Sequence, residues 1–134
     1  MPKQVINNVA GATPPLPVFS HAVISNGNVY VSGSIGSDEE YNIVGGVQQQ
    51  ARAALDNMKA ILEGAGSGLE HIVKVTIYLT NMARDFGIFN EVYAEFFRDV
   101  GALPARTCIG VAALPMGAFV EVECIAELAP GDEE

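Results

Sequence analysis

Basic residues are scarce in this chain. Its 134 residues include seven lysines and arginines against 16 aspartates and glutamates, which gives a formal net charge of −9. A protein that binds nucleic acid gathers lysine and arginine on one surface to contact phosphates. The sequence has no such basic run, so a nucleic-acid partner is disfavoured.

Long apolar runs are missing as well. No stretch of 18 apolar residues is present, as a membrane-spanning helix requires, so we expect no association with a membrane. Residues 1–8 contain one lysine and no apolar segment, unlike a secretory signal, and they lack the arginines of a transit peptide. We expect a cytoplasmic protein, with a mitochondrial location left open.

Cysteine and the common catalytic motifs are also rare. The two cysteines, Cys108 and Cys124, lie in apolar runs without a CxxC pair, which is typical of buried, reduced thiols. Their spacing alone leaves a disulfide open. The two histidines, His21 and His71, are isolated. Glycine-rich phosphate loops, HExxH and GxSxG are absent, and we expect no metal site.

What the chain does have is enough apolar material for a core. Apolar residues make up 49% of the sequence, and the length fits one domain over residues 1–134. Residues 129–134 are expected to form a mobile acidic tail. Apolar spacing predicts strands at 4–7, 21–25, 29–32, 71–80, 106–111 and 119–128, and helices at 47–63 and 86–100.

Local features refine this pattern. Asn26-Gly27 separates two β-rich runs and predicts a hairpin. Residues 33–46 are rich in glycine and acids and are expected to form a loop, while Gly64 and Gly66 end the first helix. In the strand 71–80, the side chains expected to share one face are Val73, Val75, Ile77 and Leu79.

The order of these elements predicts an α+β fold, a mixed sheet of five to six strands with two helices on one face. The last strand has apolar residues on one side and Glu121, Glu123 and Ile125 on the other. A helix-free face that still carries apolar side chains is best buried against another subunit. The sequence therefore predicts an oligomer.

One arginine stands out against this background. Arg106 opens an apolar strand, with Cys108 on the same face. A guanidinium cannot lose its charge in a protein, so it needs an anionic partner. One interpretation is an internal salt bridge to Glu121 or Glu123. The other is a fork that grips a ligand carboxylate through two parallel hydrogen bonds.

Glu121 and Glu123 pose a related question, because both lie in an otherwise apolar strand. A buried, unpaired carboxylate is costly. The two side chains therefore either face solvent or pair with a cation, or one of them holds a water molecule in a pocket.

At this point the residues resemble a known family, the RidA/YjgF family of reactive-intermediate deaminases, also called the endoribonuclease L-PSP or translation-inhibitor family. The similar segments are PVFSHAV (17–23), VYVSGSI (29–35), 50–60 with LDNMKA, VKVT through NEVYAEFF (73–97), and PARTC through LP to VEVE (104–123). The resemblance covers roughly residues 4–128, and its last block is the most specific.

The resemblance implies a fold and a reaction. It implies a chorismate-mutase-like homotrimer with three clefts between subunits. The family's active members are cofactor-free hydrolases that convert reactive enamines and imines such as 2-aminoacrylate to 2-oxo acids and ammonia, the activity of a 2-iminobutanoate/2-iminopropanoate deaminase. The partner it implies is thus a small carboxylate substrate.

The resemblance also implies site residues. Arg106 matches the arginine that binds the substrate carboxylate, and Glu121 matches the glutamate that positions the attacking water or the leaving nitrogen. Gly33, Cys108 and Asn90 match positions that line the cleft. Phe19, which would also line it, stands where the family usually has tyrosine.

Two further departures are His21, where glutamine is common, and Ser34, which shortens a polar side chain. Together with Phe19 they bear on the preferred substrate and the rate. They keep two alternatives open, a non-catalytic or chaperone-like trimer that binds small carboxylates, and an endoribonuclease or translation inhibitor.

Overall fold

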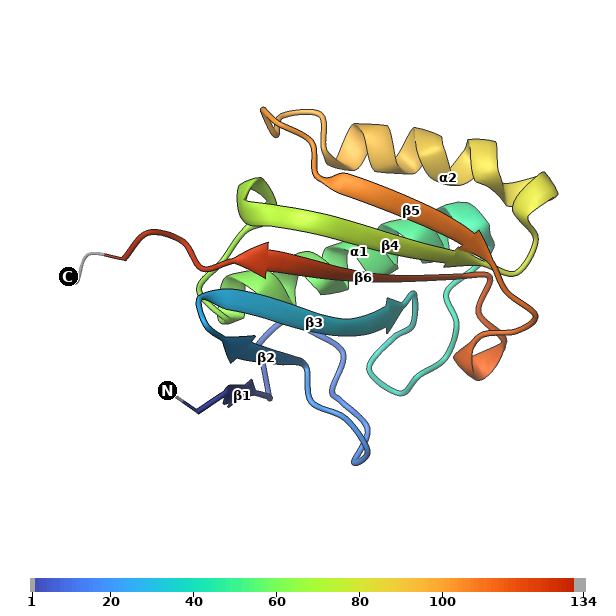
Figure 1. Ribbon diagram of the computed structural model, residues 1–134. Helices are drawn as coiled ribbons and strands as arrows, with labels where there is room; N and C mark the ends of the chain where they lie inside the picture. The colour runs from blue at the N-terminus through green and yellow to red at the C-terminus, as the bar shows by residue number, and fades with distance from the viewer. Residues whose placement is uncertain (1, 132–134) are drawn as a thin grey trace.

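The computed structural model describes residues 2–131, and Figure 1 shows the arrangement of their strands and helices. The strands are β1 (Gln4–Ile6), β2 (Ala22–Ser25), β3 (Asn28–Ile35), β4 (Ile72–Leu79), β5 (Ala105–Gly110) and β6 (Val120–Glu127). The helices are α1 (Val47–Gly64) and α2 (Met82–Phe96), with short 3-10 helices η1 (Leu69–His71) and η2 (Pro115–Gly117).

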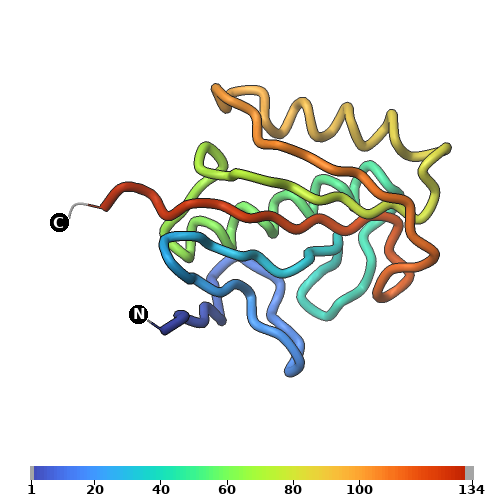
Figure 2. The backbone as a smooth tube through the Cα atoms, viewed as in Figure 1, coloured from blue at the N-terminus to red at the C-terminus, as the bar shows by residue number. Residues whose placement is uncertain are grey.

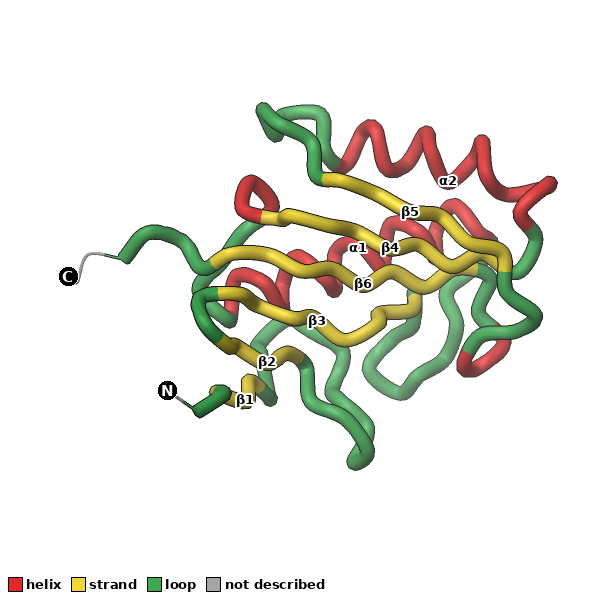
Figure 3. Tube along the Cα trace, in the orientation of Figure 1, coloured by secondary structure: helices red, strands yellow, loops and turns green. Residues whose placement is uncertain are grey.

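The six strands form one sheet in the order β1-β2-β3-β6-β4-β5. Neighbouring strands are antiparallel except β4 and β5. These two are parallel because α2 carries the chain from the end of one back to the start of the other. Figure 3 shows α1 behind the strands and α2 along the β5 edge of the sheet, and both helices contribute to the same hydrophobic core. The predicted α+β fold is confirmed.

Helix α1 agrees with the predicted range 47–63 to within one residue. Its buried positions recur at three- and four-residue spacing, and they are Gln50, Ala51, Ala54, Leu55, Met58, Ile61 and Leu62. Gly66 has a φ of +89°, in the left-handed region that favours glycine, and so ends the helical path. The hairpin predicted at Asn26-Gly27 also forms, with φ values of +51° and +82°.

Helix α2 begins four residues earlier than predicted. It starts at Met82 because Asn81 caps it, with its side-chain oxygen accepting a hydrogen bond from the Arg84 N–H at 3.1 Å. The helix ends at Phe96 rather than at residue 100. The prediction followed the apolar stripe that starts near Phe89 and missed the cap.

Strand β4 corrects another prediction. Val73 is 48% exposed, although the alternation placed it on the buried face. The register with β6 shifts between Ile72 and Lys74, so one extra residue is inserted as a bulge. Ile72 takes the inward position instead, and it is buried.

The helix-free side of the sheet is here called the open face. Its residues, by register, are Tyr30, Lys74, Thr76, Tyr78, Ala105, Thr107, Ile109, Glu121, Glu123 and Ile125. Tyr30, Ile109 and Ile125 are 44%, 42% and 37% exposed. The opposite side of β6 is buried, as predicted, so the apolar and acidic sides of this strand separate cleanly.

The end of the described chain is tied to the molecule. The N–H groups of Leu128 and Ala129 donate to the carbonyls of Gly27 and Gly66. The mobile tail expected over residues 129–134 stays a prediction, and its acidic residues 132–134 lie outside the described residues. Across residues 2–131, no helix combines the length and apolar character needed to cross a bilayer.

Candidate functional site

Arg106 lies on the helix-covered side of β5, at the edge of the sheet. Its strand partner in the parallel ladder is Val75, which is fully buried. The guanidinium reaches α2, where its Nη2 donates to Oδ1 of Asn90 at 2.6 Å. Its carbon Cζ lies over the ring of Tyr93, 4.7 Å from the centroid. The structure therefore brings Asn90 and Arg106 together.

The internal salt bridge that the sequence left open for Arg106 is wrong. Within residues 2–131, the ion pairs closer than 4.0 Å involve other cations. Glu121 and Glu123 belong to the open face, whereas Arg106 points to the other side of the sheet. Strand β4 also separates their strands. Among the described residues, Arg106 thus has no carboxylate within 4.0 Å to balance its charge.

A groove of about 610 Å³ runs beside Arg106 between α2 and β5. Its lining residues are Asn90, Tyr93, Ala94, Phe97, Arg98, Val100, Gly101, Leu103, Pro104 and Arg106. Cys108 faces the same side, with its sulfur 4.0 Å from that of Met82. Burial raises the pKa of the Cys108 thiol, although Arg106 partly opposes the shift. Cys108 is therefore a poor nucleophile at neutral pH.

Glu121 lies in a second cavity, of about 270 Å³. Its lining residues are Leu16, Val18, Phe19, Gly33, Ile35, Tyr41, Pro115, Met116 and Glu121. A Cβ atom at Gly33 would overlap Oε2 of Glu121, so only glycine leaves room for the carboxylate there. Gly33 lies within β3, which continues to Ile35 through a register shift, and the predicted loop from residue 33 is wrong at this point.

The environment of Glu121 changes its acidity. Burial raises the pKa of this carboxyl above its ordinary value, and the negative charge of Glu123 raises it further. The pKa of Tyr78 is raised as well, first by burial and then by the negative charge of Glu123. A carboxyl group with a raised pKa in an apolar cavity exchanges protons more readily near neutral pH.

The loop that contributes Phe19 to the lining of the Glu121 cavity is held in place through Thr13. Its N–H donates to Oδ1 of Asn57 at 2.7 Å, and its carbonyl oxygen lies 2.7 Å from Nε2 of His21. Nδ1 of His21 accepts from the Val9 N–H at 3.3 Å. His21 is buried, so it stabilises this loop and does not face the cavity of Glu121.

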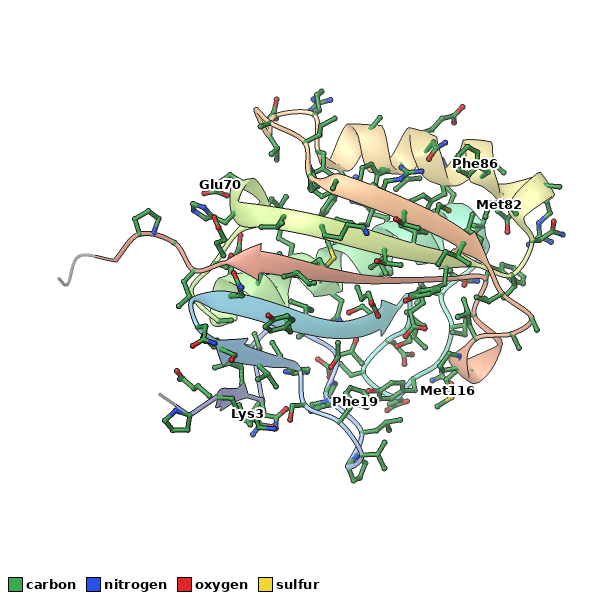
Figure 4. All side chains as sticks on the ribbon, viewed as in Figure 1. Lys3, Phe19, Glu70, Met82, Phe86 and Met116 are labelled. Carbon is green, nitrogen blue, oxygen red and sulfur yellow. The ribbon has the colours of Figure 1, made fainter. Side chains whose placement is uncertain are left out.

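Across the cavity, Tyr41 donates its hydroxyl hydrogen to the carbonyl of Pro14. Figure 2 shows the segment with Tyr41 (36–46) and the segment before β6 at the same end of the sheet. In Figure 4, Phe19 and Met116 lie at this end, while Phe86 and Met82 lie on the side of α2.

The predicted site residues therefore form two groups. Arg106, Asn90 and Cys108 lie beside α2, whereas Glu121, Gly33 and Phe19 lie around the second cavity, and the two linings share no residue. The sequence missed Tyr93, Tyr41 and Met116 as lining residues. Tyr93 could have been found from its spacing, because it follows Asn90 by three helical positions. Among the described residues, no cluster of His, Cys, Asp or Glu could hold a metal.

Comparisons with known proteins identify the family of this chain. A family model described as endoribonuclease L-PSP matches residues 10–128. A mouse protein named 2-iminobutanoate/2-iminopropanoate deaminase is 42% identical over 114 residues, 84% of this chain and 82% of that protein.

Solved structures share the fold. Escherichia coli TdcF with bound serine is 34% identical, with a TM-score of 0.87, over 94% of this chain and all of that one. RidA from the Antarctic bacterium Psychrobacter sp. PAMC 21119 is 36% identical, with a TM-score of 0.85, over 93% of this chain and 99% of that one. The chain therefore belongs to the endoribonuclease L-PSP family, the RidA/YjgF family whose motifs it carries.

Proposed function

We propose that this protein hydrolyses small enamine and imine acids, such as 2-aminoacrylate, to 2-oxo acids and ammonia. The observation that carries the proposal is Arg106, a half-buried guanidinium in a groove with no carboxylate partner among the described residues. Such a group binds an external carboxylate through two parallel hydrogen bonds. The mouse relative's name supports the reaction class.

The proposed reaction requires Arg106 to position the substrate and Glu121 to relay protons. Protonation of an enamine at carbon 3 gives the iminium form of the imine. A water oxygen then bonds to carbon 2 while the C=N π electrons move to nitrogen, and Glu121 takes one proton from that water and passes it to nitrogen. The hydroxyl group of this carbinolamine then gives its remaining proton to Glu121 as the C=O bond forms, the C–N bond breaks and ammonia leaves. Arg106 binds the carboxylate and orients carbon 2 for attack.

The proposed assembly is a homotrimer. One chain holds Arg106 and Glu121 on opposite sides of its sheet, so a single copy cannot present both to one small substrate. The partly apolar open face offers a surface for a neighbouring copy. In the proposed cleft, the Arg106 side of one copy meets the Glu121 cavity of the next.

The direct test is a deamination assay. Imines are generated in place from several amino acids by an amino-acid oxidase, and ammonia and 2-oxo acid are measured over the uncatalysed rate. We expect acceleration by the wild-type protein and near-background rates for Arg106→Ala. Equal rates for both proteins would refute the proposal.

The same assay tests the first alternative, and a salt titration of RNA binding tests the second. A trimer that only binds carboxylates would retain 2-oxo acids without releasing ammonia faster. An endoribonuclease would bind RNA with an affinity that falls steeply with salt. The net charge of −9 argues against that reading, and we expect no RNA binding in a salt titration.

A further inference from the structure

Two side chains of α2 hold the guanidinium of Arg106. Asn90 accepts a hydrogen bond from Nη2 at 2.6 Å, and the ring of Tyr93 lies under Cζ at 4.7 Å. Asn90 and Tyr93 are three positions apart on the helix, so they lie on the same helical face. The helix thus contacts Arg106 once through the amide oxygen of Asn90 and once through the face of the Tyr93 ring.

Tyr93 is itself fixed in place. Its side chain is buried, with the residue 7% exposed. The ring centroids of Phe89 and Phe97 lie 5.8 Å and 4.6 Å from its own. Close packing between neighbouring rings restricts rotation, so Tyr93 presents a constant surface to Arg106.

A ring holds a guanidinium differently from a carboxylate. A carboxylate occupies two N–H donors and neutralises the charge, whereas a ring attracts the cation through its face and leaves the N–H groups free. Arginine has five such donors, and Asn90 uses one of them. The Phe86 and Phe89 rings lie farther away, both at 5.9 Å. The charge of Arg106 and most of its donors thus remain available.

The hydroxyl of Tyr93 plays a different part. It is buried and has no hydrogen-bond partner among the described residues, and burial raises the pKa of this phenol, so it stays protonated at neutral pH. An unpaired buried hydroxyl destabilises the fold rather than helping it. The ring is therefore the part of Tyr93 that acts on Arg106.

We propose that Tyr93 is a positioning residue of the carboxylate site, whose packed ring holds the guanidinium of Arg106 so that its free N–H groups meet the carboxylate of the ligand. This inference rests on the proposed function, because it takes that ligand to be the carboxylate of an imino acid substrate or its 2-oxo acid product.

The test compares variants at position 93 in the full chain. The probe is 2-oxobutanoate, whose Kd is measured by titration calorimetry, beside kcat and KM for imine hydrolysis. Tyr93→Phe keeps the ring, and its values should stay within about twofold of wild type. Tyr93→Leu removes the aromatic face and should raise Kd and KM by roughly tenfold, with a smaller change in kcat.

A matched control is Phe96→Leu, which makes the same kind of change on the same helix. The ring of Phe96 packs edge-on against Phe97, at 79°, and lies beside Arg52 rather than Arg106. This variant should leave the Kd of 2-oxobutanoate unchanged even if it lowers stability.

A second series covers the case in which Tyr93→Leu does not fold. Progressively fluorinated phenylalanines at position 93 keep the shape of the ring while weakening the attraction of its face for a cation. The affinity for 2-oxobutanoate should fall stepwise along this series.

The outcomes are distinct. Equal Kd values for the phenylalanine, leucine and fluorinated variants, in a protein that deaminates imines, would overturn this inference alone. A wild-type protein that neither binds 2-oxobutanoate nor releases ammonia would overturn the proposed function and this inference with it.

Discussion

At the residue scale, Arg106 and Glu121 are expected to contribute unequally. Arg106→Lys keeps the charge but loses the planar fork, and we expect a loss of roughly 2 kcal/mol or more in transition-state stabilisation, at least about 30-fold in kcat/KM. Glu121→Gln keeps the shape but not the proton acceptor. It should cost less on a small, reactive imino acid than on a bulky, slow one. The measurement is kcat/KM for both variants on both substrates.

Near wild-type activity of Arg106→Lys on both imino acids would mean that the arginine is structural. The site assignment would then be withdrawn, while the fold would stand.

A second prediction at the residue scale concerns Cys124 and the free energy of unfolding at alkaline pH. Burial, followed by the charge of Glu123, raises its pKa from 9.0 to about 12. The unfolded thiol ionises near 9 and the folded one does not, so its contribution is present below pH 9 and is lost as the pH rises toward 12. The free energy of unfolding should fall by about 1 kcal/mol per pH unit above about pH 9 from this group alone.

Urea unfolding at pH 8, 9 and 10, at one protein concentration, checks this slope against Cys124→Ala. The variant should be less stable at pH 8 because of the cavity it leaves, but its stability should decline less steeply. Parallel declines for the two proteins would contradict the buried-thiol explanation.

At the scale of the element, the cap of α2 matters because this helix carries both Asn90 and Tyr93. Asn81→Ala removes the acceptor for the Arg84 N–H and should lower the free energy of unfolding by about 1 kcal/mol. Asn81→Asp keeps the acceptor and adds a charge that favours the helix N-terminus, so it should retain the stability. Urea unfolding of the three proteins measures the difference, and an unchanged free energy of unfolding for Asn81→Ala would show that the cap is dispensable.

The sequence predicts an element well when residues within that element determine its bounds, and poorly when pairing with a distant strand determines them. The range of α1 was predicted to within one residue because its apolar repeat and terminal glycines act locally. The inward position of Ile72 and the extension of β3 to Ile35 both follow shifts in pairing with β6. The sequences of β3 and β4 alone do not specify those shifts. A prediction from simple alternation therefore put Val73 on the wrong face of the sheet.

At the scale of the whole molecule, the same reasoning applies to the site. The sequence placed Arg106 with Cys108 on one face, and Glu121 with Glu123 on one face. These two faces lie on opposite sides of the sheet because of how β6, β4 and β5 pair, with β4 in the middle. No local sequence pattern predicts that pairing. The resemblance identified Arg106 and Glu121 as site residues. The order of the strands explains why one copy cannot bring both side chains to one small substrate.

This separation predicts complementation between impaired variants, measured on a bulky, slow imino acid, on which Glu121→Gln is expected to lose most. Arg106→Ala and Glu121→Gln proteins, mixed after unfolding and refolded together, should regain activity because some clefts receive Arg106 from one copy and Glu121 from the other. Random assembly in equal amounts should restore about a quarter of the sites. The control is the same two variants mixed without unfolding.

Sedimentation should report trimers for the wild type and the refolded mixture. No recovery in a mixture of trimers would place both residues of a site in the same copy, and a monomeric wild type at micromolar concentration would remove the clefts altogether.

The contact between Gly33 and Glu121 has a consequence for how such proteins diverge. A methyl group at position 33 and a carboxylate at position 121 cannot occupy the same space. A descendant that acquires a side chain at 33 must displace the carboxylate end of residue 121, and with it the group that we propose relays the proton. The two positions should therefore drift as a pair, so that a relative with a side chain at the first also lacks the acid at the second.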